Sequence, residues 1–382
     1  MVIIHLQEIG ILAGKRKKKL ITKNAVRAAV FLCLIVLIVL GCNYIFCFAD
    51  AEHTETIMNE FYGQEEDSVD VIYFGSSATQ RAFVQPVAFH DEGVAGYSIA
   101  SGSQPFMLTK YMMEEVLKTQ DPDLFIIEVR GACKPPEELW DVAVRRLLDN
   151  MPLSDNKLKA IRAVTEYAEG TETGIDETGL SYIFTLLKYH GRWNPLKQPK
   201  YWDNIDYYKG YTMDSGVCFR CTEIHPIDYT EANVMPIHER TEAALRDLLD
   251  YCDTIDTKVL FVVSPYEASE KGMGKINYSK QIIEERGYEV LNFLPQEKRE
   301  MLGLNDKDSY YNREHLNFNG SLMYTDYLSK YIKENYGVHD RRGDSRYDSW
   351  EEQYERLQHN LETIYNVNYS DMMETVKQVR GE

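Results

Sequence analysis

Basic residues are scarce in this chain. Its 382 residues include 42 Lys and Arg against 60 Asp and Glu, so the formal net charge is −18. Residues 1–27 hold seven basic residues and one acidic residue, which leaves the rest of the chain with a net charge of −24. Such an acidic surplus repels polyanions, and it argues against a general nucleic-acid-binding protein.

The motifs of several common enzyme classes are absent. The chain has no G-x-S-x-G nucleophile elbow, no phosphate-binding P-loop and no H-E-x-x-H zinc motif. Cys218 and Cys221 have the spacing of a zinc or redox pair, but no second Cys or His pair follows at zinc-finger spacing. We therefore expect no metal and no organic cofactor, and we interpret the two cysteines as a disulfide or as inert thiols.

One stretch lacks charge altogether. Residues 28–49 contain no Asp, Glu, Lys or Arg, and Asn43 is the only strongly polar residue among them. A helix of this length can cross a hydrocarbon core of about 30 Å. The apolar run continues past Cys42, which favours an uncleaved anchor over a signal peptide or a lipoprotein cleavage site. Basic residues precede the run, and Asp50 and Glu52 follow it. The positive-inside rule then predicts a single-pass plasma-membrane protein with a cytosolic N-terminus.

The remainder alternates between apolar runs and helical patterns. After a polar spacer at 50–68, this alternation across 69–335 predicts an α/β domain with a doubly wound, parallel, five-stranded sheet of order 2-1-3-4-5. An insertion at 134–232, helical and rich in aromatic residues, interrupts the pattern, and we expect it to cover part of the active-site edge. The charged segment 336–382 ends in an amphipathic helix and is expected to be peripheral. The predicted strands are residues 69–74, 95–102, 123–129, 258–264 and 288–293.

A serine and a histidine stand at the two ends of this pattern. Ser77 follows the first predicted strand, and His315 follows the last. Because the carboxyl ends of parallel strands share one edge of the sheet, the two side chains can meet there. A histidine in hydrogen-bond reach can take the serine proton and later return it to a leaving group. Each residue also has a simpler interpretation, since Ser77 and Gln80 fit a helix-capping box and His315 alone is compatible with a surface position.

The stretches around these residues resemble the SGNH/GDSL hydrolase superfamily, in particular its membrane-anchored members of the alginate O-acetylation and teichoic-acid D-alanylation type. Gly75-Ser76-Ser77 stands where the family has Gly-Asp-Ser, which marks Ser77 as the nucleophile. Residues 98–104 resemble the second family block, whose glycine, here Gly102 beside Ser101, supplies an oxyanion-hole amide. The resemblance covers residues 69–335 and implies an SGNH-like (flavodoxin-like) fold.

The last block of the resemblance contains both matches and departures. Asn312 and His315 occupy the place of the family's Asp-x-x-His, and Asn317 follows as a further candidate for the binding site. Taken alone, Asn317 also fits an N-cap of the helix that follows it. Since an asparagine replaces the family aspartate, the residue that orients His315 is Asn312, or else Asp308 or Glu314. Of the two acidic residues we favour Asp308, because Glu314 is adjacent to the histidine in sequence.

The third family block has no match here. Where the family has an asparagine, the chain reads Glu128-Val129-Arg130-Gly131. Arg130 or a residue of the insertion then replaces this oxyanion donor, or the oxyanion hole has fewer donors. A further possibility is that Arg130 only pairs with an acidic neighbour.

The sequence thus predicts a membrane-anchored, extracytoplasmic serine esterase or acyltransferase. As the resemblance implies, its substrate is an acylated carbohydrate or cell-wall polymer, and a membrane acyltransferase is a candidate partner. The competing hypothesis is a catalytically inactive SGNH-fold protein that binds or assembles envelope components. The altered third block and Asn312 favour that alternative.

The change from basic residues before the apolar run to acidic residues after it, across 15–52, provides a test of topology. A reporter that is active only in the cytosol, fused after Glu382, is expected to be silent, because the whole chain after the apolar run is predicted to lie outside. Reporter activity in intact cells measures this directly. Strong activity at that position would contradict the predicted localisation.

Overall fold

A computed structural model describes residues 2–45, 54–191, 206–370, 372 and 374. The chain divides into two compact units. One consists of residues 1–48 and 184–199, and the other of residues 49–183 and 200–382. Each unit is described by itself.

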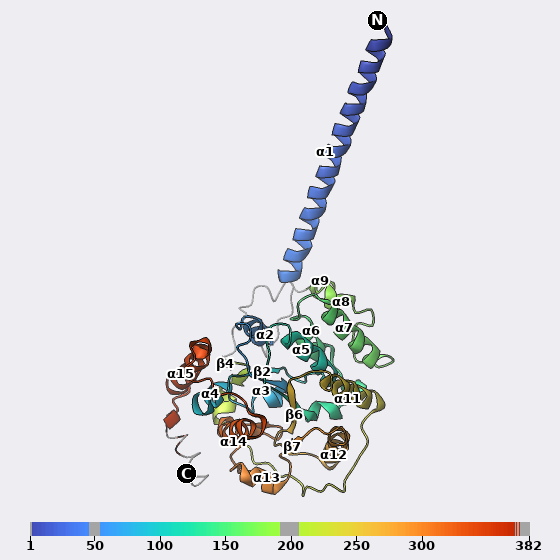
Figure 1. Ribbon diagram of the computed structural model, residues 1–382. Helices are drawn as coiled ribbons and strands as arrows, with labels where there is room; N and C mark the ends of the chain where they lie inside the picture. The colour runs from blue at the N-terminus through green and yellow to red at the C-terminus, as the bar shows by residue number, and fades with distance from the viewer. Residues whose placement is uncertain (1, 46–53, 192–205, 371, 373, 375–382) are drawn as a thin grey trace. The chain divides into compact units, whose positions relative to one another are not determined.

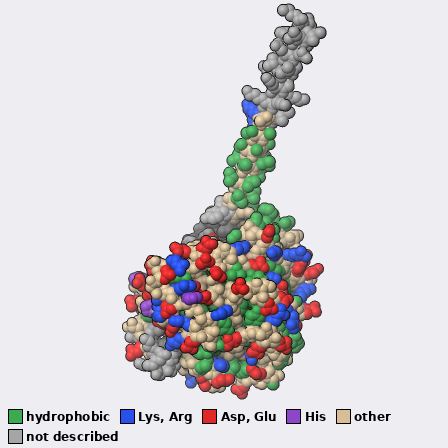
Figure 2. Space-filling model, in the orientation of Figure 1, with side chains coloured by type: hydrophobic (Ala, Val, Ile, Leu, Met, Phe, Trp, Pro, Cys, Tyr) green, Lys and Arg blue, Asp and Glu red, His purple; other side chains and the backbone are tan. Residues whose placement is uncertain are grey.

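The first unit is dominated by one long helix, α1 (Val2–Ile45). Its segment Thr22–Asn43 is long and apolar enough to span a membrane, and none of that segment is buried against the rest of the protein. Figure 2 shows hydrophobic side chains along this stretch. The predicted span at 28–49 agrees with this segment, although its residues 46–49 lie outside the described part of the chain. A short helix, α9 (Leu186–Tyr189), belongs to the same unit.

The second unit is built on a five-stranded sheet of order β2-β1-β3-β6-β7 (Figure 1). All four pairings are parallel, which confirms the predicted α/β class and strand order. Four of these strands, β1, β2, β3 and β6, are buried along nearly their whole length, as the continuous apolar runs predicted. The strands are β1 (Val71–Gly75), β2 (Gly96–Ala100), β3 (Leu124–Glu128), β6 (Lys258–Val263) and β7 (Val290–Asn292).

Alternate residues along each strand enter two separate hydrophobic cores, one on each face of the sheet. On β1, Ile72 and Phe74 belong to one core, and Val71 and Tyr73 to the other. The first core is completed by residues of α2 (Thr54–Tyr62), α5 (Thr109–Val116), α6 (Asp141–Leu148), α7 (Asp155–Ala168), α8 (Leu180–Ile183), α11 (Glu239–Cys252) and α12 (Glu270–Glu285). The second includes residues of α4 (Gln85–Glu92), α10 (Ser215–Phe219), α14 (Phe318–Tyr336) and α15 (Asp348–Thr363).

The insertion contributes a hairpin that closes one edge of the sheet. Strands β4 (Asp206–Tyr208) and β5 (Tyr211–Met213) are joined by a turn whose Lys209 carbonyl accepts a hydrogen bond from the Ser98 amide of β2 at 3.0 Å. An unpaired edge strand invites aggregation, and this contact covers the edge of β2. The aromatic residues Trp193, Tyr201 and Trp202 of the insertion lie outside the described residues.

The C-terminal segment is not peripheral, contrary to the sequence-based expectation. Helix α15 packs on α4, and the buried Trp350 donates its indole N–H to the Gly96 carbonyl of β2 at 2.8 Å. Arg341 forms a bidentate ion pair with the buried Asp70, just before β1. Its Nε lies 2.7 Å from Oδ2 of Asp70, and its Nη2 lies 2.8 Å from Oδ1. Nothing in the sequence indicated these contacts, because most residues of this segment are polar or charged and only its few apolar residues are buried.

Helix α12 begins at Glu270, eight residues before Tyr278, where the sequence first shows a clear helical pattern. Ser269 caps it by accepting a hydrogen bond from the Gly272 amide. Two glycines in its first turns obscured the helical pattern. A Cβ on one of them, Gly274, would lie 2.6 Å from the Met235 side chain, so close packing explains its presence.

The hairpin turn provides a test of how the β2 edge is closed. A Cβ on Gly210 would lie 2.1 Å from the Ser98 carbonyl oxygen, and the residue has a φ of +85°. Gly170 also has a positive φ, +74°, but a Cβ there meets nothing within 4 Å. Both Gly→Ala variants incur backbone strain of about 1–2 kcal/mol. Gly210→Ala is expected to lose about 1–3 kcal/mol more because of the steric overlap. Denaturant titration of the two variants in detergent measures this difference, and equal losses would contradict it.

Candidate active site

Three side chains form a continuous chain of hydrogen bonds at the carboxyl edge of the sheet. Ser77 is the first residue of α3 (Ser77–Gln80), directly after β1. Its Oγ lies 2.8 Å from Nε2 of His315, and Nδ1 of His315 lies 2.9 Å from Oδ1 of Asn312. The structure therefore brings together the predicted nucleophile, base and orienting residue.

The backbone determines the tautomer of the histidine. Oδ1 of Asn312 also accepts a hydrogen bond from the Glu314 amide at 2.8 Å, so the oxygen of the asparagine, not its nitrogen, faces the ring. An amide oxygen only accepts, and Nδ1 of His315 must therefore carry the proton. Nε2 then has a free lone pair directed at the Ser77 hydroxyl, which is the arrangement that a general base needs.

A tight hairpin positions both partners of Ser77. Strand β8 (Tyr310–Asn312) ends with the asparagine, and β9 (His315–Leu316) begins with the histidine. The two residues pair across the hairpin, which places their side chains next to one another.

The alternative interpretation of Ser77 as a helix cap does not hold. The residue that caps α3 is Ser76, and it makes no side-chain capping hydrogen bond. The Gln80 side chain, which would complete a capping box, donates instead to the Ala100 carbonyl at the end of β2. The Ser77 hydroxyl is therefore directed at the histidine.

Asp308 does not orient the histidine, contrary to one of the alternatives drawn from the sequence. Its carboxylate accepts hydrogen bonds from Asn305 and Ser309, at 3.4 and 3.3 Å. Glu314 is largely exposed and faces Arg130. Asn312 is thus the residue that contacts the imidazole, as its place in the resemblance implied.

Asn317 serves the fold and not the site. Its Oδ1 accepts from the Gly320 amide at 3.1 Å and caps α14, and its Nδ2 donates to the backbone carbonyls of Asp308 and Arg220. All of its polar atoms are thereby occupied and the residue is buried. The structure therefore supports the interpretation of Asn317 as a helix N-cap and not the predicted role in substrate binding, because the cap and the two carbonyl contacts occupy its side chain.

Arg130 supports the histidine from the other side. Its guanidinium stacks on the Tyr266 ring, 3.8 Å from the ring centre, and Nη1 donates to the Glu314 carbonyl at 2.8 Å. A weaker ion pair with the Glu314 carboxylate, at 3.6 Å, adds to this contact. Of the alternatives for Arg130, pairing with an acidic neighbour is the one that the structure shows. The contact also fixes the backbone immediately before His315.

The loop after β2 brings two further residues, Ser103 and Gln104, to the cavity beside Ser77. Ser101 is buried and its hydroxyl contacts Gln104 at 3.3 Å. Gly102 is buried as well, and its carbonyl accepts a hydrogen bond from Arg146. It is Ser103, in a left-handed conformation with a φ of 55°, that borders the cavity beside Ser77 together with Gln104. A left-handed non-glycine residue is uncommon and costs strain, which is typical of functional loops.

A cavity of about 320 Å³ opens beside Ser77. Four basic and two acidic side chains border it, so its lining is cationic although the chain as a whole is strongly acidic. Burial is the main cause that lowers the pKa of Lys134, and the nearby Arg130 charge lowers it further. The charged residues of the lining are Arg130, Lys134, Lys271, Lys275, Glu138 and Glu314.

The same positive environment acts on the catalytic candidate itself. Burial, followed by the charges of Arg130 and Arg81, lowers the pKa of His315 to about 3. The imidazole is therefore neutral at physiological pH, as a general base must be before it accepts a proton. The low pKa also means that the resting imidazole is a weak base.

Sequence analysis missed the residue beneath the site, Glu128. This carboxylate ends β3, is 2% exposed, and accepts hydrogen bonds from the amides of Arg130 and Ser264 at 3.2 and 3.1 Å. Burial is the main cause that raises its pKa. It joins the loops after β3 and β6, and the close approach of Gly75 to its Cβ leaves no room for a side chain at residue 75. A charged residue in the last position of a buried strand is the signal that could have identified it.

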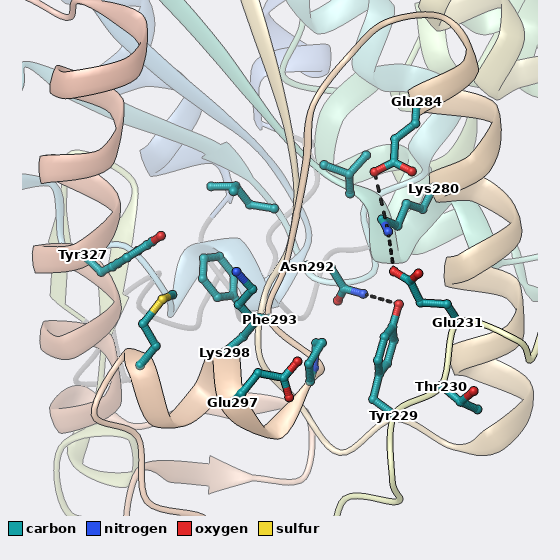
Figure 3. Close-up of a pocket in the computed structure, with 14 residues that line it drawn as sticks. Tyr229, Thr230, Glu231, Lys280, Glu284, Asn292, Phe293, Glu297, Lys298 and Tyr327 are labelled. Carbon is teal, nitrogen blue, oxygen red and sulfur yellow. Dashed lines mark hydrogen bonds and ion pairs between the residues drawn. The ribbon is translucent and has the colours of Figure 1, made fainter.

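A second cavity, of about 420 Å³, lies near the end of β7 and contains none of the predicted site residues. Figure 3 shows part of its polar lining in contact with other lining residues. Lys280 contacts Glu231 at 2.8 Å and Glu284 at 3.6 Å, and Asn292 donates to Tyr229 at 3.0 Å. Within the described part of the chain no group of three or more His, Cys, Asp or Glu side chains is placed to hold a metal ion. Cys218 and Cys221 are free thiols, which agrees with the second of their two interpretations.

Comparisons with known proteins find no protein family and no curated protein that matches this chain. The site is therefore interpreted from its own geometry and from the resemblance described above.

The pKa of His315 can be tested by one substitution. Asn312→Asp places a carboxylate next to Nδ1 and is expected to raise the pKa of His315 by about 1–3 pH units, because a nearby negative charge stabilises the imidazolium. NMR titration of protein with labelled histidine, with the signal assigned by its loss in His315→Gln, measures the change. Asp308→Asn is the matched control and should leave the pKa unchanged, since that carboxylate faces Asn305 and Ser309. An unchanged pKa in Asn312→Asp would contradict the hydrogen-bond chain.

Proposed function

We propose that this protein is a membrane-anchored, extracytoplasmic serine esterase or acyltransferase of the SGNH type. The observation that carries the proposal is the unbroken chain of hydrogen bonds from Ser77 through His315 to Asn312. Its substrate, in this proposal, is an acyl ester of a carbohydrate or cell-wall polymer. Helix α1 is the anchor, with the N-terminus in the cytosol and the α/β unit outside, and a membrane acyltransferase is a candidate partner.

The reaction proceeds in two steps. Ser77 Oγ attacks the ester carbonyl while its proton passes to Nε2 of His315, and the resulting tetrahedral intermediate carries the charge on the former carbonyl oxygen. This intermediate collapses, and the leaving alcohol takes the proton from His315. The acyl group now forms an ester with Ser77. Attack by water releases a carboxylic acid, whereas attack by a sugar hydroxyl forms a new ester, and His315 transfers the proton in either case.

Asn312 distinguishes this site from one with a carboxylate at the same position. An amide holds the imidazole in the tautomer that the reaction needs, but it stabilises the imidazolium less than a carboxylate does. Together with the low pKa of His315, this predicts a slow enzyme unless the substrate itself contributes negative charge.

The cationic lining of the cavity favours an anionic substrate. Arg130, Lys134, Lys271 and Lys275 surround the approach to Ser77, and an acidic group on the polymer would be attracted to them. Such a group would also offset the positive charges that lower the pKa of His315, so that the imidazole becomes a stronger base when substrate is bound.

The competing proposal is a binding or assembly protein that has kept the fold and lost the chemistry. Asn312 and the low pKa of His315 are the observations that favour it. A fluorophosphonate probe separates the two, because only an activated serine reacts with it. Labelling that is lost in Ser77→Ala supports the enzyme, and absence of labelling supports the alternative.

Ser77 and His315 are expected to act as one unit. Each alanine variant should lower turnover of a small acetyl ester by at least about 10³-fold, and the double variant should be no worse than Ser77→Ala, because the hydroxyl and its base serve a single step. Asn312→Ala should cost less, because it removes only the orienting group. Steady-state kinetics give these values. Additive losses in the double variant would be inconsistent with a shared proton-transfer step.

The charge preference of the cavity generates a separate expectation. The paired substrates are O-acetylated glucuronic acid and O-acetylated glucose. Lys271 is exposed, and the variant Lys271→Gln should lower kcat/KM about 5-fold for the acidic sugar only. This decrease corresponds to roughly 1 kcal/mol. Lys159→Gln, an exposed lysine outside the cavity, is the control. Acetate release measures the rates, and a preference for the neutral sugar would refute the anionic substrate without affecting the role of Ser77.

A further inference from the structure

Helix α9 is attached to the end of the long N-terminal helix. The amide of Leu186 donates to Oδ1 of Asn43 at 3.1 Å, and the Thr185 hydroxyl donates to the Asn43 carbonyl at 3.5 Å. Both helices belong to the same compact unit, although 142 residues separate Asn43 from Thr185 in sequence. The insertion therefore returns to the point where α1 ends.

Asn43 performs a structural task in this contact. The first residues of a helix have amide N–H groups without a partner inside the helix. Thr185, the residue that precedes α9, makes no side-chain capping hydrogen bond, and Asn43 supplies the acceptor for Leu186 instead. The only strongly polar residue of the apolar run is thus used to hold α9 in place.

Asn43 also indicates the depth of α9 relative to a bilayer. It is the last residue of the segment Thr22–Asn43, which is long and apolar enough to cross the hydrocarbon core. The end of such a segment lies at the boundary between acyl chains and head groups. A residue hydrogen-bonded to Asn43 lies at the same boundary, so α9 begins there.

The side chains next to this contact are apolar and exposed. Phe184 is 46% exposed and Leu187 is 55% exposed. Phe184 precedes α9, and the Leu187 amide donates to the Phe184 carbonyl at 2.9 Å, so the two residues belong to one turn and offer adjacent apolar side chains. Large apolar side chains at this depth would otherwise face water.

We propose that Phe184 and Leu187 insert into the outer leaflet, so that residues 184–189 form a second membrane contact beside the spanning helix. The partner of this surface is the lipid bilayer itself, because Asn43 holds the surface at the depth where acyl chains begin. Helices that lie in the interface bind in this way, with apolar side chains below the head groups. The inference rests on the proposed membrane anchorage and is independent of the chemistry at Ser77.

The consequence concerns how the α/β unit is tethered. The chain passes between the two units at residues 48–49, 183–184 and 199–200. With only the spanning helix in the membrane, the first of these would be the single link to the bilayer. With α9 embedded as well, three chain segments connect the α/β unit to the membrane, which restricts its reorientation more than one linker does.

Photo-crosslinking of the full chain tests the proposal. Benzoylphenylalanine replaces Phe184 or Leu187 in protein reconstituted into nanodiscs of phosphatidylethanolamine and phosphatidylglycerol, and intact-mass spectrometry detects lipid adducts. Adducts are expected at both positions. Val36, 55% exposed within the spanning segment, is the positive control, and Phe219, 53% exposed on α10 in the other unit, is the negative control.

The outcomes are distinct. Adducts at positions 184 and 187, with none at Phe219, support the membrane contact, and a several-fold decrease in Asn43→Ala would support the role of the capping hydrogen bond. Lipid adducts at Val36 alone, or protein adducts at positions 184 and 187, would overturn the contact while leaving the anchor intact. No adduct at Val36 would overturn the anchor and the contact together. Turnover of a soluble acetyl ester by the same samples reports on Ser77 separately.

Discussion

The hydrogen bond between Ser77 and His315 joins residues that lie 238 positions apart, and much of the α/β unit is arranged so that it forms. Ser77 is fixed by the end of β1, whose neighbours β2 and β3 hold it on both sides. His315 has no long strand of its own. Its hairpin is held by the Asn317 cap on one side and by the contact of Arg130 with the Glu314 carbonyl on the other. The precision of the site therefore comes from residues that do not themselves take part in chemistry.

The charge of the cavity beside Ser77 is opposite to the net charge of the chain. The acidic exterior keeps the protein soluble and away from polyanions, whereas the cavity beside Ser77 gathers positive side chains. Burial, followed by the charges of Arg130 and Arg81, lowers the pKa of His315. In the proposed reaction, the Arg130 charge that would attract an anionic substrate would therefore also weaken the base until that substrate is bound.

The sequence predicted the features that depend on local pattern. Continuous apolar runs predicted the five strands, their alternation with helices indicated a parallel sheet, and the observed strand order is the one that fits the resemblance. Ser77, His315 and Asn312 were identified as site candidates because they lie in recognisable blocks near the ends of the α/β pattern. Strands of two or three residues, such as those of the hairpin that holds His315, have no periodicity to detect. Asp308 and Asn317 were included among the site residues because they lie close to His315 in sequence, but proximity in sequence does not determine where a side chain is directed. The burial of the C-terminal segment depends on distant partners, Asp70 above all, which no local pattern reveals.

The same C-terminal segment determines when the α/β unit can fold, if that unit is exported as proposed. Asp70 is buried immediately before β1, and its charge is compensated by Arg341, which emerges 271 residues later. An ionised carboxylate in such surroundings is costly without a partner. With the α/β unit outside the membrane, as proposed, β1 would emerge with Asp70 uncompensated until nearly the entire chain has been synthesised and translocated. Folding strand by strand from the N-terminus would be disfavoured in that topology, and an incompletely exported chain would remain open to proteases and chaperones until its last helices arrive.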